Sequence, residues 1–60
     1  MDKKQKFLKI YANLPLGIRH EIILVINNEP ITWEVAFIEV SNDTALSEQI
    51  LNKLESLQII

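Results

Sequence analysis

The apolar positions of the first segment follow a helical repeat. Phe7, Tyr11 and Leu14 recur at intervals of four and three residues, with lysines between them. This spacing gathers the apolar side chains on one side of a helix, so we predict a first helix over residues 3–13. Gly17, the only glycine, follows a proline and is expected to take a positive φ where the chain turns.

The next segment changes to a β pattern. Residues 22–26 read Ile-Ile-Leu-Val-Ile, a run rich in β-branched side chains that is typical of a strand buried on at least one face. Asn27 and Asn28 follow, and asparagine tolerates the left-handed backbone of a tight hairpin turn. We therefore predict a β-hairpin whose returning strand includes residues 31–33. Pro30 cannot donate a hydrogen bond to a sheet, so it belongs on an edge.

Residues 33–40 fit two periods at once. In a strand, alternate side chains would line two faces, and β-propensity favours that interpretation. In a helix, Thr32 would be the N-cap, and one face would carry Trp33, Ala36, Phe37 and Val40. Because Glu34 and Glu39 would interrupt a strand buried on both faces, we favour the helix.

A polar break at residues 41–44 separates this segment from a final helix. Asp43 or Thr44 can cap the helix that follows. Exposing the apolar side chains of Ile59 and Ile60 to water is unfavourable, so we expect them to pack on the core or on a partner. The apolar stripe of the final helix consists of Leu46, Ile50, Leu54 and Leu57.

Together these segments predict one small α+β domain over residues 1–60, with an N-terminal helix, a short β-hairpin and one or two C-terminal helices. The alternative is an all-α helix-turn-helix bundle. A chain of this size buries only about 60% of the surface that its unfolded form exposes. It has no cysteine for a disulfide and one histidine, too few for a zinc site, so association with another chain is the expected source of extra stability.

The charges divide unevenly along the chain. Residues 1–20 carry four lysines and Arg19 against Asp2, a net +4, while residues 21–60 carry seven acids against Lys53, a net −6. The basic segment is expected to dock on the acidic remainder of its own fold; the alternative is a neighbouring subunit or an anionic surface. The total of −2 disfavours nucleic acid as a partner.

Catalytic chemistry is not expected from these residues. His20 is the only side chain that titrates near neutrality without help, and no nucleophile or carboxylate pair is placed to work with it. Residues 41–44 lack the acidic spacing of a calcium loop, and a lone glycine cannot form a phosphate-binding loop. We therefore predict a protein that is not an enzyme and has neither cofactor nor metal.

The chain shows no export signal, because lysines interrupt its N-terminal segment. Its longest apolar runs, residues 22–26 and 35–38, are far shorter than the 18 or so residues that a membrane span needs. The expectation is a cytoplasmic protein without a membrane segment.

Residues 31–60 nevertheless carry a familiar pattern. Ile31-Thr32-Trp33-Glu34 could open a helix, Ser41 to Thr44 could form a polar turn, and Ile50-Leu51 continues an apolar stripe. This part resembles the helix-turn-helix of winged-helix DNA-binding domains, and residues 19–24 are similar to the helix that precedes it. The resemblance implies DNA binding by Thr44, Ala45, Gln49, Asn52 and Lys53. Glu48 on the same face would repel phosphate, so this function is the alternative.

The leading functional hypothesis is a small non-catalytic interaction or accessory module that self-associates or binds another protein. It rests on the 48% apolar content, which exceeds what a 60-residue interior can enclose. The side chains expected to form the interaction surface are Trp33, Val35, Ile38, Ile59 and Ile60.

Overall fold

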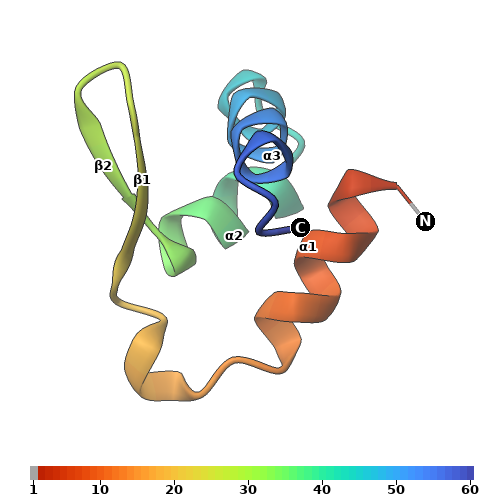
Figure 1. The fold of residues 1–60 in the computed structure, drawn as a ribbon, viewed down its shortest axis with the longest axis vertical. Helices are drawn as coiled ribbons and strands as arrows, with labels where there is room; N and C mark the ends of the chain where they lie inside the picture. The colour runs from red at the N-terminus through yellow and green to blue at the C-terminus, as the bar shows by residue number, and fades with distance from the viewer. Residues whose placement is uncertain (1) are drawn as a thin grey trace.

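The computed structural model describes residues 2–60 and confirms the α+β arrangement (Figure 1). Both C-terminal helices are present. The elements in chain order are α1 (Lys3–Ala12), the 3-10 helix η1 (Leu16–Ile18), β1 (Ile22–Ile26), β2 (Glu29–Thr32), α2 (Trp33–Ser41) and α3 (Ala45–Ser56).

The two strands form the predicted hairpin. Asn27 and Asn28 have φ values of 54° and 67°, the pair of left-handed residues that a two-residue type I′ turn requires. Beyond the turn, Ile26 faces Glu29 and Val25 faces Pro30, and the register becomes irregular between Ile22 and Leu24. The all-α alternative is therefore wrong.

The preceding helix implied by the winged-helix resemblance is also absent at residues 19–24. Arg19 follows η1, and Ile22 to Leu24 belong to β1. The physical reason is the β-branched run, which pairs with β2 and buries Leu24 on the inner side of the hairpin.

Residues 33–41 form a helix, as predicted, because a side-chain cap and two backbone hydrogen bonds from outside the helix stabilise its first turn. The Thr32 hydroxyl accepts a hydrogen bond from the Val35 N–H at 3.1 Å. The N–H groups of Trp33 and Glu34 donate to the carbonyls of Glu21 and Arg19. These caps satisfy N–H groups that a helix start leaves unpaired, and they outweigh the β-propensity of the sequence. Consequently β2 ends at Thr32, and Trp33 does not lie on the strand as predicted.

The chain turns after α1 without a left-handed glycine. The positive φ expected at Gly17 is wrong: this residue lies in η1, whose 3-10 geometry reverses the chain with negative φ values. Among residues 2–60, left-handed backbone occurs instead at Asn27, Asn28, Asp43 and Gln58.

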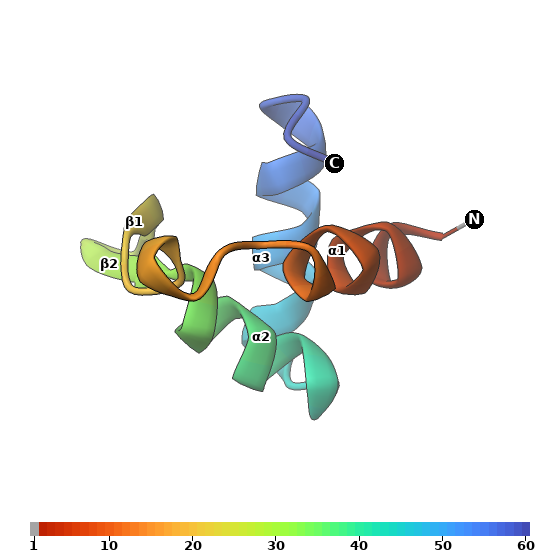
Figure 2. The same ribbon diagram turned by 90° about the horizontal axis from the view of Figure 1, so that it is seen from below.

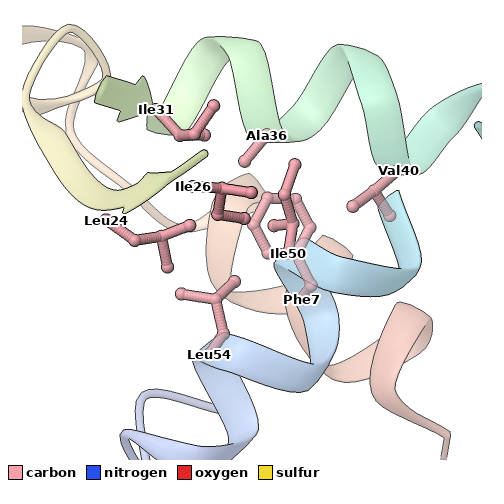
Figure 3. Close-up of a cluster of buried hydrophobic side chains, with 8 residues drawn as sticks. All are labelled: Phe7, Leu24, Ile26, Ile31, Ala36, Val40, Ile50 and Leu54. Carbon is pink, nitrogen blue, oxygen red and sulfur yellow. The ribbon is translucent and has the colours of Figure 1, made fainter. Parts of the chain in front are cut away.

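Helix α3 lies between the hairpin and α1, as both views show (Figures 1 and 2). It contacts α1, α2 and β1, so three of the elements that supply the core meet on it. Its side chains Ile50 and Leu54 are fully buried, and Figure 3 shows them between the hairpin and the other helices. The buried apolar side chains are Phe7, Leu24, Ile26, Ile31, Ala36, Val40, Ile50 and Leu54.

Candidate interaction surface

The described chain exposes more large apolar side chains than the core buries, because one of the eight buried apolar residues is Ala36. Eight of them in residues 2–60 are at least about one-third accessible to solvent. They come from η1, β1, α2 and the segment after α3. The exposed set is Leu16, Ile22, Val25, Val35, Phe37, Ile38, Leu57 and Ile59. Scattered apolar residues are normal on a protein surface, so their grouping on single elements is the informative part.

Helix α2 presents apolar side chains on opposite sides. Ala36 and Val40 are fully buried against the core. Val35 and Ile38, three residues apart and therefore neighbours on one helix face, are 39% and 55% exposed. We call these two residues the α2 apolar face. Exposed apolar side chains opposite the buried side of a helix are suited to contact with a partner, so the α2 apolar face is a candidate for such a contact.

The five side chains predicted for the interaction surface divide into two groups. Val35, Ile38 and Ile59 are exposed. Trp33 and Ile60 are only partly accessible and pack against the core, with the Trp33 ring centroid 5.9 Å from that of Phe7. The exposed group is therefore centred on α2, and Trp33 contributes mainly to packing.

Sequence reasoning missed the exposed side chains of β1. Ile22 and Val25 are 60% and 57% exposed, although their strand reads as a buried apolar run. Pro30 could have indicated this exposure, because a strand that pairs with an edge proline in a short hairpin has one face and one edge open to solvent. Leu16 and Leu57 were likewise not predicted to be exposed.

The role of Arg19 was also not indicated by the sequence. Its guanidinium lies 4.5 Å from the centroid of the Tyr11 ring, and its Nη2 donates to the Tyr11 carbonyl at 3.2 Å. The Tyr11 ring also stacks on Phe37, with centroids 4.4 Å apart. Because the Arg19 carbonyl accepts from the Glu34 N–H, this residue joins the end of α1 to the start of α2.

The basic N-terminal segment docks on acidic residues of the same chain, as its charge predicts. The Nζ of Lys3 lies 3.2 Å from Glu55 Oε1, and the Nζ of Lys4 lies 2.9 Å from Asp43 Oδ1. These pairs are at least partly exposed, so each stabilises the fold only weakly. They nevertheless use two of the four N-terminal lysines internally.

The residues predicted to contact DNA lie on and before α3. Thr44 is the N-cap of this helix, and its side chain accepts from the Ser47 N–H. Ala45, Gln49, Asn52 and Lys53 are exposed. Two features reduce the affinity of this face for phosphate: Asn52 accepts a hydrogen bond from Lys3 Nζ at 2.6 Å, and the acidic Glu48 is exposed beside the candidates.

His20 lies beside one carboxylate. Its side chain is largely exposed, and its Nδ1 contacts a carboxylate oxygen of Glu34. Residues 2–60 contain no pocket, and no group of three or more His, Cys, Asp or Glu side chains in this range could hold a metal ion. None of the helices described is long and apolar enough to cross a membrane.

Comparison with protein families, curated proteins and solved structures finds no match to this chain.

Proposed function

We propose that this chain is a small non-catalytic interaction module that associates with copies of itself through its exposed apolar side chains. The observation that carries the proposal is the α2 apolar face, where Val35 and Ile38 lie in solvent on a helix whose other side is fully buried. An exposed apolar pair opposite the buried side of a helix is more readily explained by a covering partner than by an isolated monomer.

The energetics favour a weak dimer. Burying a fully exposed valine or isoleucine stabilises by roughly 1.5–3 kcal/mol, and a two-fold interface buries each side chain once per copy. Val35 and Ile38 are already partly covered, so their contribution is smaller. Association costs roughly 4–15 kcal/mol in lost freedom of motion. The α2 apolar face therefore supports at most micromolar affinity, and further contacts are needed to strengthen it.

Sedimentation velocity over a range of about 1 to 200 μM, concentrations that bracket a micromolar dissociation constant, tests the proposal. The expected result is a rise from the monomer mass of 6.9 kDa to twice that value. Ile38→Lys should shift the transition to higher concentration. The matched control, Gln49→Lys, adds the same single positive charge on the exposed face of α3 and should not weaken association. A constant monomer mass over the whole range contradicts the proposal.

DNA binding is the second candidate function. It is favoured by the three-residue connection between α2 and α3, the arrangement of a helix-turn-helix, and by the exposed polar side chains of α3. A salt-sensitive gel shift of duplex DNA at about 100 mM salt that is lost in Gln49→Ala and Lys53→Ala would support it. Even the non-specific binding of DNA-binding proteins has a dissociation constant of about 100 μM or lower. The absence of any shift at about 100 μM protein would therefore exclude DNA binding.

A further inference from the structure

The two edges of the hairpin are not equivalent. Ile26 and Glu29 flank the two-residue turn, so they form a hydrogen-bonded pair, and the next pair, Val25 and Pro30, does not exchange hydrogen bonds. In such a pair the backbone groups point away from the partner strand. On β2 the outward group is the nitrogen of Pro30, which has no hydrogen to donate and blocks further pairing. On β1 the outward groups are the N–H and C=O of Val25.

The outer edge of β1 is free to pair within the described chain. No backbone hydrogen bond outside the hairpin reaches Ile22 to Ile26 from any of residues 2–60. The strand has no charge, no proline and no glycine, and Val25 and Ile22 are more than half exposed. The register shift between Ile22 and Leu24 makes the start of β1 irregular. Leu24 to Ile26 continue as a regular, uncharged edge without proline, which is the type of edge that recruits another strand.

The position of α3 points to the same edge. This helix contacts β1 more extensively than β2, so it is not centred on the hairpin. Leu57 follows Ile50 and Leu54 on the apolar stripe of α3, yet it is 51% exposed while they are fully buried. Leu57 therefore leaves apolar surface at the C-terminal end of α3 that the monomer does not cover.

We infer that β1 pairs edge to edge, in antiparallel orientation, with β1 of a second copy of this chain. The product is a four-stranded sheet in the order β2, β1, partner β1, partner β2, with Pro30 at both outer edges. This inference rests on the proposed self-association and names the contact that strengthens it. Three or more strands with an apolar face are a stable unit, whereas one isolated hairpin is marginal.

The charges around β1 favour a second copy in this orientation. Glu21 precedes the strand, and the amide side chains of Asn27 and Asn28 follow it. With Leu24 at the two-fold axis, Glu21 of each copy lies at the end where the partner turns, near amides that can donate to its carboxylate. Parallel pairing would instead place the two Glu21 carboxylates side by side, which is repulsive.

Removing only the outward N–H of Val25 tests this pairing. The 60-residue chain is synthesised with a methyl group on the Val25 nitrogen, and a Val25→Thr chain serves as control because it keeps the N–H and the β-branched shape. Loss of two symmetric hydrogen bonds should raise the dimer dissociation constant roughly 30-fold or more. Val25→Thr should change it less than about fivefold. Both constants are measured by sedimentation, and circular dichroism checks the fold.

The outcomes separate the two proposals. Association of the N-methylated chain at wild-type concentrations overturns the β1 pairing but leaves self-association through apolar side chains intact. An equal loss in both variants also overturns it, because the side chain rather than the backbone would then be responsible. A wild-type chain that stays monomeric overturns both proposals.

Amide exchange of the unmodified chain decides the question if the methylated chain does not fold. Protection of the Val25 amide that increases with protein concentration supports the pairing. Exchange of this amide as fast as in an unprotected peptide, at concentrations where the dimer is populated, overturns it.

Discussion

Helices α2 and α3 lie next to each other in sequence and in space but divide their side chains differently. α3 buries Ser47, Ile50 and Leu54 on one side, while residues such as Glu48 and Gln49 cover the other with polar groups. α2 buries Ala36 and Val40 yet exposes Val35 and Ile38 on the opposite side. The monomer therefore covers the apolar side chains of α3 itself more completely than those of α2, and α2 is the helix with more apolar surface left for a further contact.

The largest expected effect comes from the same substitution placed in each helix. Ile50→Ala leaves a cavity at a fully buried position and should destabilise the fold by about 3–4 kcal/mol. Ile38→Ala removes a side chain that is 55% exposed, and alanine is the better helix former, so monomer stability should change by less than about 0.5 kcal/mol. Urea unfolding at low micromolar concentration measures both values.

Repeating the unfolding at high protein concentration sharpens this first comparison. If a partner covers α2, Ile38→Ala should become more destabilising as the concentration rises, because binding adds to apparent stability. A cost for Ile38→Ala at low concentration that equals the cost of Ile50→Ala would contradict the division between the two helices.

The second effect concerns Arg19, which supports α2 rather than α3. Arg19→Ala removes the contact with the Tyr11 ring and the hydrogen bond to the Tyr11 carbonyl, and should cost about 2 kcal/mol. Arg19→Lys keeps the charge but loses the planar stacking, so it should recover only part of this. Hydrogen exchange should accelerate first at Glu34, whose N–H donates to the Arg19 carbonyl. Uniform acceleration over both helices would argue against a local role.

The third effect compares the two helix caps. Thr44 accepts from the Ser47 N–H, and its hydroxyl lies 3.0 Å from Glu39 Oε1 in a partly buried position. Thr32 accepts only from the Val35 N–H, in an exposed position. We expect Thr44→Ala to cost about 1–2 kcal/mol and Thr32→Ala about 1 kcal/mol or less. Thermal unfolding of both variants decides the order, and a larger cost for Thr32→Ala would reverse this ranking.

The smallest effect belongs to the ion pair between α1 and the turn that joins α2 to α3. Lys4→Met removes the pair with Asp43, whose side chain is mostly exposed, and should cost about 0.5 kcal/mol or less. The difference from wild type should vanish at about 1 M salt, where the Debye length is about 3 Å. A cost that persists at high salt would point to lost packing of the lysine stem.

Much of the secondary structure could be predicted because its signals are local. Asn27 and Asn28 indicate the hairpin turn, and Thr32 and Thr44 indicate where α2 and α3 begin. Each of these residues acts through its own backbone or through an N–H three residues away. Gly17 shows the limit of such reasoning, because a 3-10 helix reverses the chain without the positive φ that a lone glycine suggests.

The surface was harder to predict than the elements. Trp33 and Val35 are both apolar and two residues apart, yet one packs on Phe7 and the other faces solvent. Which of them is covered depends on where α1 and α3 lie, and spacing along the chain does not determine this. The role of Arg19 depends in the same way on Tyr11, eight residues away and in another element.

The central position of α3 bears on the order in which the chain folds during its synthesis. α1 and the hairpin leave the ribosome before the helix that lies between them. Until α3 follows, Phe7 and Ile31 have no Ile50 or Leu54 to pack against, and the apolar inner face of the hairpin stays open to nascent neighbours. When α3 packs, it completes the core and covers this face of the hairpin. Unintended strand pairing between nascent chains on one polysome is therefore easiest before α3 has emerged.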